Sequence, residues 1–256
     1  MTKMEYAKTI AELINGEVKE VEKENGIIYT GVTKKSVTNI SPIIYIDNLY
    51  ENGVDVLDAS KKVEEKIKQS NVSFDIDFIN DYEKAKPRLQ ARLYNNKTNV
   101  EVSKSAERYG FDDLIIVPIL IVSEDDDGTA TTKVTRDLLA KWNKSATEVV
   151  SDAIENLDYE IMDMAKLLGI SLGEPMGMYV VTNKKRRYGA ASVLKAKDEL
   201  NRMFPEGYIV LPSSVHEVIV VKNDDNIKAY TEMVKMVNSD VVAPEEVLSD
   251  KVYKFN

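Results

Sequence analysis

Apolar and polar positions at the start of the chain follow a helical period and then alternate. Residues 10–14 place isoleucine and leucine side chains on one stripe, which predicts a short amphipathic helix. Asn15 and Gly16 come next, a pair typical of a helix C-terminus. The alternation then continues on both sides of Asn25 and Gly26. Because both central residues of a two-residue type I′ turn need positive φ, this pair predicts a β-hairpin.

The pattern continues with a short strand at 43–46 and a helix at 56–67 whose apolar residues share one face. The segment that follows is mixed, and Pro87 interrupts it. We therefore predict an N-terminal lobe over residues 1–104 and a C-terminal lobe over residues 105–256.

The second lobe begins with an apolar run over 114–122 that predicts a buried strand. Pro118 lies in its middle, and because proline has no N–H for the ladder, an edge position or a bulge is expected there. A turn at 127–128 leads into a second strand. Thr135 then fits the N-cap of one helix, and residues 145–148 form an S-x-x-E capping box for another.

The last third of the chain repeats this order of strands and helices. A strand is expected at 178–182, a helix ending at Phe204, a strand over 215–221 and a helix beginning near Asn226, and Pro244 starts a final turn. Hairpins followed by helices predict an α+β fold, with mixed or antiparallel sheets in two packed lobes.

Composition excludes several classes of function. The chain has no cysteine and one histidine, which rules out disulfides, thiol chemistry and histidine-rich metal sites. Its 34 basic and 43 acidic side chains give a net charge of -9, which argues against direct binding to nucleic acid. The longest apolar run is too short to span a bilayer, and no signal peptide is evident. We expect a cytoplasmic protein that does not bind membranes.

The segment LPSSVHE contains the single histidine and the candidate catalytic residues, which are Ser213, Ser214, His216 and Glu217. A serine nucleophile with His216 as its base would need a hydrogen bond of roughly 3 Å. On a strand, positions 214 and 216 share a face but stand roughly 7 Å apart. The alternative interpretation is a turn followed by a strand in which the histidine bonds locally.

A basic cluster interrupts the otherwise acidic chain at Asn183, Lys184, Lys185, Arg186 and Arg187. Such a cluster could hold a phosphate, a nucleotide or the acidic surface of a partner. It could equally be a solvated turn whose charges protect a strand edge. No glycine-rich phosphate-binding motif accompanies it.

Two acidic stretches are candidate metal sites. In EDDDG, with Gly128 as the sixth position of a calcium loop, Ser123 would be first and Val134 twelfth, where carboxylates are required. A solvated turn is expected instead. The stretch with Asp75, Asp77, Asp81 and Glu83 is expected to be surface, so we predict no metal and no cofactor.

Four segments of the sequence carry a resemblance to a known family: NISPIIYI, MYVVTNKKRRYGAASVL, IVLPSSVHEVIVV and VAPEEVLSDKVYKF. They resemble an uncharacterised bacterial family, a domain of unknown function found in Firmicutes and their mobile elements. The order of elements is more remotely similar to the YtpQ-like family, which is also uncharacterised. Neither resemblance implies an activity or a catalytic residue.

The absence of a recognisable catalytic constellation favours a non-catalytic binding or regulatory protein, associated with a bacterium, a phage or another mobile element. Its expected partner is a protein. The alternative is a small hydrolase or phosphoester-binding enzyme that uses His216 with a nearby serine. That alternative requires the LPSSVHE segment to lie beside the basic cluster.

Overall fold

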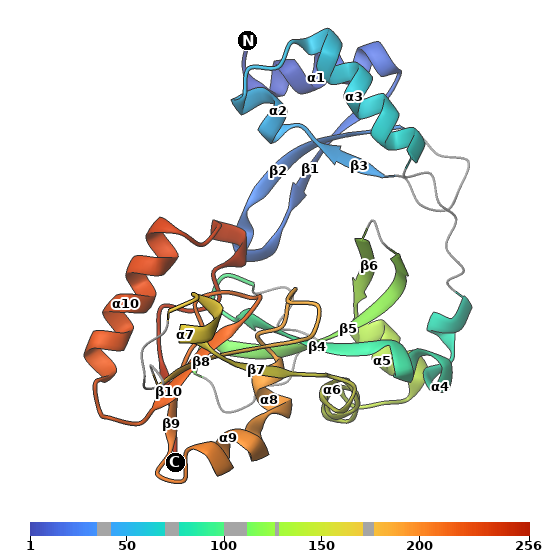
Figure 1. Ribbon diagram of the computed structural model, residues 1–256. Helices are drawn as coiled ribbons and strands as arrows, with labels where there is room; N and C mark the ends of the chain where they lie inside the picture. The colour runs from blue at the N-terminus through green and yellow to red at the C-terminus, as the bar shows by residue number, and fades with distance from the viewer. Residues whose placement is uncertain (35–41, 70–76, 100–111, 126–127, 171–176) are drawn as a thin grey trace. The chain divides into compact units, whose positions relative to one another are not determined.

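A computed structural model describes residues 1–34, 42–69, 77–99, 112–125, 128–170 and 177–256 (Figure 1). The helices are α1 (Lys3–Ile14), α2 (Asp47–Glu51), α3 (Val56–Gln69), α4 (Tyr82–Ala85), α5 (Arg136–Trp142), α6 (Ala146–Glu155), α7 (Met164–Leu167), α8 (Ser192–Lys195), α9 (Lys197–Met203) and α10 (Ile227–Asp240). The strands are β1 (Glu17–Glu22), β2 (Ile28–Thr33), β3 (Ile43–Tyr45), β4 (Leu89–Asn95), β5 (Leu114–Asp125), β6 (Gly128–Lys133), β7 (Glu160–Asp163), β8 (Met178–Thr182), β9 (Tyr208–Leu211), β10 (Val218–Lys222) and β11 (Tyr253–Phe255). Within these ranges, no helix combines the length and apolar character that crossing a membrane requires.

The strands of the described ranges form three antiparallel sheets, and this confirms the predicted α+β fold. The strand orders are β1-β2-β3, β4-β5-β6 and β11-β9-β10-β8-β7. The chain divides into two compact units, Met1–Asp75 and Ile76–Asn256. This division differs from the boundary expected after residue 104, because β4 pairs with β5 along its whole length and so belongs to the second unit.

In unit 1 (Met1–Asp75), local chemistry sets the ends of α1 and of the first hairpin. Asn15 ends α1 in the left-handed conformation, with φ 56°, as its pairing with Gly16 predicted. Asn25 and Gly26 also adopt positive φ, as the hairpin prediction required. The strand register places Glu22 opposite Ile28, so five residues, 23–27, connect the strands instead of the two-residue turn that we expected.

The sheet β4-β5-β6 begins unit 2 (Ile76–Asn256), and β5 is its central strand, so Pro118 does not lie on an edge strand. The N–H of Val134 donates to the Pro118 carbonyl at 3.0 Å. Because the N and C=O groups of one residue face the same neighbour in an antiparallel sheet, the missing N–H of Pro118 faces the side on which β6 has ended at Lys133. A bulge does occur nearby, between Ile121 and Ser123.

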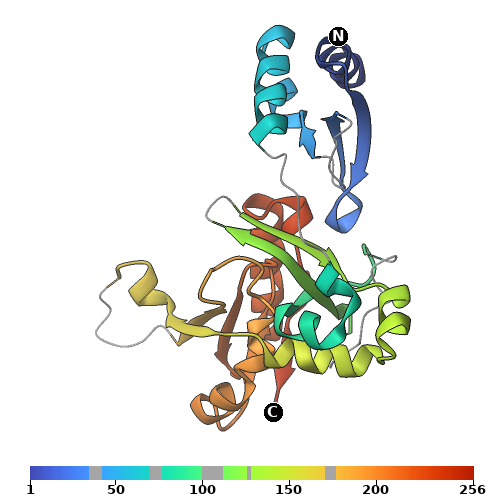
Figure 2. The ribbon, with the colours of Figure 1, turned by 90° about the vertical axis from the view of Figure 1, so that its right-hand side faces the viewer.

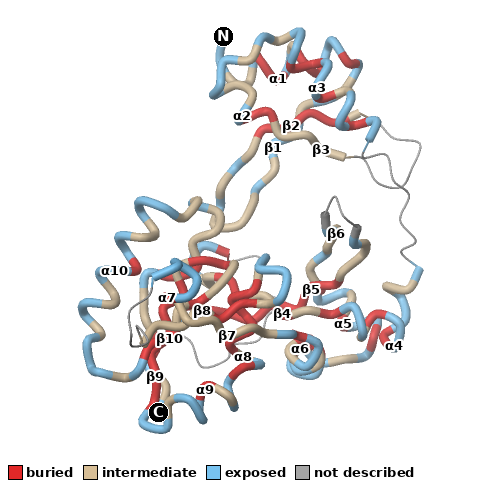
Figure 3. Tube along the Cα trace, viewed as in Figure 1, coloured by how far each residue is buried: buried red, intermediate tan, exposed pale blue. Residues whose placement is uncertain are grey.

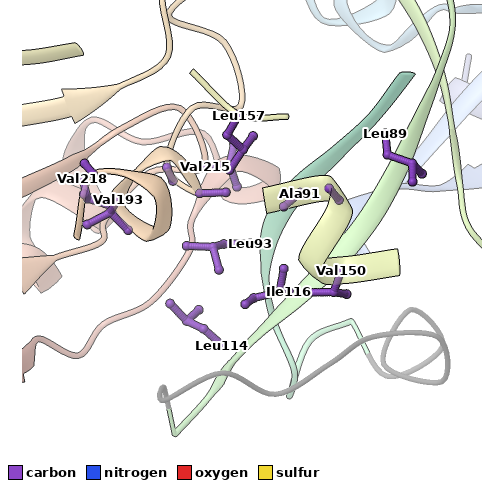
Figure 4. Packing of buried hydrophobic residues seen from close by; sticks show 14 of the residues in the cluster. Leu89, Ala91, Leu93, Leu114, Ile116, Val150, Leu157, Val193, Val215 and Val218 are labelled. Carbon is purple, nitrogen blue, oxygen red and sulfur yellow. The ribbon is translucent and has the colours of Figure 1, made fainter. Parts of the chain in front are cut away.

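One large hydrophobic core holds unit 2 together. It joins one face of β4-β5-β6 to one face of the five-stranded sheet, with α6 and α8 packed between. The predicted caps position the helices: Thr135 caps α5, and Ser145 with Glu148 forms the capping box of α6. Figure 3 shows the buried residues concentrated in the central strands. Figure 4 shows the inward side chains of Leu89, Ala91, Leu93, Leu114, Ile116, Val150, Leu157, Val193, Val215 and Val218.

The five-stranded sheet has a second face that is only partly covered. Val181 and Val218 point into the large core. On the opposite face, Leu211 and Val221 pack against Val234 of α10. β7 is one of the two edge strands of this sheet, and Figure 2 shows β7 and α7, in yellow, at the margin of unit 2. The part of the second face next to β7 is where the candidate site lies.

Candidate functional site

Three of the four segments that carry the family resemblance lie side by side in unit 2: those that contain the basic turn (residues 183–187), LPSSVHE and APEEVLSD. The segment 212–217 is irregular rather than part of the strand expected over 215–221, because its backbone bonds to two other segments. The N–H of Gly189 donates to the His216 carbonyl at 2.9 Å, and the N–H of Val215 donates to the Glu246 carbonyl at 2.9 Å. The basic turn, the LPSSVHE segment and the C-terminal APEEVLSD segment are therefore held side by side.

His216 has hydrogen-bond partners at both ring nitrogens. Nδ1 accepts from the backbone N–H of Tyr188 at 3.1 Å. Nε2 lies 3.0 Å from a carboxylate oxygen of Glu246. A ring whose Nδ1 accepts a hydrogen bond carries its proton on Nε2, where it donates to that carboxylate. The histidine thus ties the basic turn to the C-terminal segment.

The two candidate serines lie in different places. Ser214 is buried, and its hydroxyl oxygen accepts from the backbone N–H of His216 at 3.0 Å. It therefore contacts the main chain of His216 and not a ring nitrogen. Ser213 lines a cavity on the partly covered face of the sheet. This geometry lacks the serine-to-imidazole hydrogen bond of an activated nucleophile.

The cavity has a volume of about 260 Å³. Ile219, Val180 and Met162 stand opposite one another on β10, β8 and β7, so they form one row of the cavity wall. One step along the same face, Glu217 and Thr182 add a carboxylate and a hydroxyl. The complete lining is Met162, Met164, Leu167, Val180, Thr182, Arg186, Ser213, Glu217 and Ile219.

Glu217 is the distinctive group of this cavity. Its side chain has no hydrogen bond or ion pair with any residue in the described ranges. Burial raises its pKa; nearby His216 opposes this shift, and the negative charge of Glu246 adds to it. Glu217 is partly buried, and a carboxylate that loses part of its contact with water without gaining a partner is destabilising to the fold. Such groups concentrate at functional sites.

The backbone of the basic turn does not form a phosphate cradle. Asn183 organises the turn: its carbonyl accepts from the N–H of Arg186 at 3.0 Å, and its side-chain oxygen accepts from the N–H of Arg187 at 3.1 Å. The N–H of Lys184 donates to Asp158 at 3.1 Å. These donors are therefore directed within the protein rather than toward an anion.

Some side chains of the basic cluster lie close to a carboxylate, and others form no ion pair with a described residue. Lys185 pairs with Glu124 at the end of β5. Arg186 lies 3.8 Å from Glu160 and 3.4 Å from the sulfur of Met162, so it sits over the cavity rim. Among the side chains that the structure describes, none forms an ion pair with Lys184 or with Arg187. Arg186 and Tyr188 both have positive φ, which strains non-glycine residues.

The acidic stretches show no metal-binding arrangement where they are described. Asp126, Asp127 and Asp75 lie outside the described residues. Asp81 caps α4 by accepting from the N–H of Glu83 at 3.1 Å. Across the ranges that the structure covers, no three His, Asp or Glu side chains are grouped to hold a metal ion.

Sequence reasoning missed Glu246 and the methionines of the cavity. Glu246 lies in the segment APEEVLSD, which the sequence already marks as a motif, but nothing in the spacing of that motif indicates a contact with His216. The sequence also does not indicate Arg92, whose guanidinium stacks 3.8 Å above the ring of Tyr188.

The fold and the site define an α+β protein with a small cavity, lined by both apolar and polar residues, on the open part of a five-stranded sheet. The sequence profile of a family of unknown function, DUF5688, matches residues 3–256. The chain therefore belongs to this family, as the resemblance to an uncharacterised family predicted. No curated protein and no solved structure matches the chain.

Proposed function

We propose that the protein is a non-catalytic binding protein that docks a partner protein on one surface of unit 2. We call this surface the cavity face, and it consists of the nine cavity-lining residues together with Leu168 and Ile170. One observation carries the proposal: Leu167, which lines the cavity, is 45% exposed, and Leu168 and Ile170, which follow it in the chain, are 61% and 41% exposed. Large exposed apolar side chains that gather around a cavity are typical of interaction surfaces.

A protein partner fits this surface better than a small ligand does. The cavity is smaller than the range of about 300–1,000 Å³ that is usual for small-molecule sites. A ligand of that size would leave the exposed rim uncovered, whereas a protein surface would cover rim and cavity together. Met162 and Met164 add flexible, polarizable side chains, which adapt readily to a partner.

The contacts of His216 support a binding role rather than a catalytic one. A general base must have a nitrogen lone pair within reach of the proton that it removes. The lone pair of Nδ1 receives the Tyr188 N–H, and Nε2 faces Glu246. We therefore assign His216 the structural role of joining the segments that frame the cavity.

We place this binding function in the bacterial cytoplasm, in association with a phage or another mobile element. A cysteine-free chain suits a reducing compartment, and the motif resemblance supports the origin.

The test is site-specific photo-crosslinking in cells that naturally produce the protein. A photoreactive phenylalanine analogue replaces Leu168, and the control carries it at Leu57 of unit 1, which is similarly exposed at 58%. We expect one discrete protein adduct from position 168 and none from position 57. Competition with unlabelled protein should abolish the adduct, and the Leu168→Ser competitor should be much weaker than Leu57→Ser. Adducts that are absent, or that are equal at both positions, would contradict the proposal.

A hydrolase or phosphoester-binding enzyme is the second candidate, and one observation favours it. His216 does lie beside the basic turn, because Tyr188 donates to its ring. Its test is to assay the protein against a panel of esters and phosphoesters beside His216→Ala. Turnover that disappears in the variant would support this candidate at the expense of the binding role.

A further inference from the structure

We propose that the cavity receives a lysine side chain of the partner protein, with its ammonium group at Glu217. This inference rests on the proposed function and names the chemical group that the cavity face recognises. It is carried by the charge of the cavity, by its hydrogen-bonding groups and by its shape.

The charge of the cavity favours a cation. Glu217 has no partner in the described ranges, whereas the positive charge of Arg186 already faces Glu160. Glu246 adds a further negative charge close enough to act on Glu217. A ligand cation would therefore supply the opposite charge that Glu217 lacks, in a site partly shielded from water.

The hydroxyl group of Thr182 favours a ligand group that donates hydrogen bonds. Thr182 donates its hydroxyl hydrogen to the His216 carbonyl at 2.8 Å. The Thr182 oxygen therefore has only lone pairs left for a further hydrogen bond, and the Glu217 carboxylate likewise only accepts. A lysine ammonium has three donors and no acceptor. A carboxylate or phosphate ligand would find these two groups unfavourable, although Ser213 could adapt to either.

The apolar row suits the stem of lysine. Met162, Val180 and Ile219 form a wall along which four methylene groups can lie, and the carboxylate stands at one end of this wall. Long side chains often bury such a stem while the charged end reaches a polar group. The compact ammonium of lysine also needs less room than the planar guanidinium of arginine.

The experiment uses the full chain with ¹³C-labelled methionine methyl groups, observed by NMR. Met162 and Met164 report on the cavity, and Met203, which does not line it, serves as the internal reference. The probes are acetyl-Leu-Lys-Leu-amide, the same peptide acetylated on the lysine Nε, and the free diamine cadaverine. The variants are Glu217→Gln and the control Glu206→Gln, an exposed glutamate whose contact is Lys222 at 3.5 Å.

We expect the lysine peptide to shift the methyl signals of Met162 and Met164 but not that of Met203. Nε-acetylation and Glu217→Gln should each weaken binding by about tenfold or more, the effect of losing a charge-assisted hydrogen bond. Glu206→Gln should bind as the native chain does. Cadaverine should bind more weakly than the peptide, because it lacks the flanking leucines.

The inference would be overturned by the absence of any shift up to the solubility limit of the peptide, by equal binding of the acetylated peptide, or by full binding to Glu217→Gln. Cadaverine binding as tight as that of the peptide would indicate a free amine instead and would also overturn it. None of these results alters the crosslinking experiment at Leu168. A partner that crosslinks there and binds Glu217→Gln equally would leave the proposed function intact and exclude lysine recognition.

Discussion

Asp113 is a buried carboxylate and Glu217 a partly buried one in unit 2, and their surroundings are opposite. Asp113 is 4% exposed, and each of its oxygens accepts a hydrogen bond. The hydroxyl of Tyr253 donates to one oxygen, and the hydroxyl of Ser249 donates to the other at 3.0 Å. Burial, with the bond to Asp113 as a second cause, raises the pKa of Tyr253 and keeps its hydroxyl protonated. Glu217 has no such donors among the described residues.

The difference separates a structural group from a binding group. A buried carboxylate with both oxygens satisfied stabilises the contact between segments far apart in sequence, here β5 and the C-terminal β11. A carboxylate left without donors destabilises the fold, and an external partner that supplies those donors is the explanation that we propose. The Asp113 cluster therefore stabilises the fold, and we propose that the Glu217 cavity serves recognition.

The largest effect is expected from breaking the Asp113 cluster. Asp113→Ala leaves the hydroxyls of Tyr253 and Ser249 buried without an acceptor, so it should lower the free energy of unfolding of unit 2 by about 3 kcal/mol. Urea denaturation followed by fluorescence measures this, because the single tryptophan, Trp142, is buried in unit 2. Asp112→Ala is the control: Asp112 is exposed, and its loss should cost less than about 1 kcal/mol. Equal losses of unfolding free energy in the two variants would contradict the structural role that we assign to Asp113.

A smaller loss is expected from disturbing the frame of the cavity. A Cβ atom at Gly189 would lie 2.3 Å from the Thr182 hydroxyl and 2.8 Å from the His216 carbonyl. Gly189→Ala should therefore lower the free energy of unfolding by about 2 kcal/mol. It should also displace the methyl signals of Met162 and Met164. A fully stable variant with unchanged signals would show that this frame is not rigid.

Local chemistry made part of this molecule predictable from its sequence. Asn15 with Gly16, Asn25 with Gly26 and the S-x-x-E box act through neighbours within four residues, so their structures could be inferred directly. The hydrophobic period likewise indicated the helices and the α+β class.

The features that could not be predicted from the sequence depend on contacts between segments far apart in the chain. β4 joins β5 across the boundary that we expected at residue 104, and His216 meets Glu246 only because two irregular segments bond together. Ser213 and Glu217 were named as catalytic candidates, and the fold places both in the cavity. No spacing in the sequence indicates that Glu217 would have no hydrogen-bond or ion-pair partner among the residues that the structure describes.

Replacing Arg186 by glycine should relieve the backbone strain beside the cavity. Arg186 has a φ of 53°, a conformation that costs a non-glycine residue about 1–2 kcal/mol. Arg186→Gly should therefore raise the free energy of unfolding by about 1 kcal/mol, as measured by the same fluorescence assay. Arg187 does not have positive φ, so Arg187→Gly should instead be destabilising by about 0.5–1 kcal/mol. A destabilised Arg186→Gly variant would place Arg186 among the structural groups.

The smallest expected change tests the central claim most directly: the thermal stability of Glu217→Gln against the native chain from pH 4 to pH 8. The folded protein raises the pKa of Glu217 above its ordinary value of 4.5, so the folded state binds this proton more tightly than the unfolded state. The native chain should lose stability as the pH rises above 4.5, and the variant should lack this contribution.

We predict that Glu217→Gln melts at a higher temperature than the native chain at pH 7, and that the difference shrinks as the pH falls toward 4. Glu206→Gln should match the native chain throughout. A Glu217→Gln variant that melts at a lower temperature at pH 7 would show that Glu217 stabilises the fold, and would contradict its assignment as a binding group.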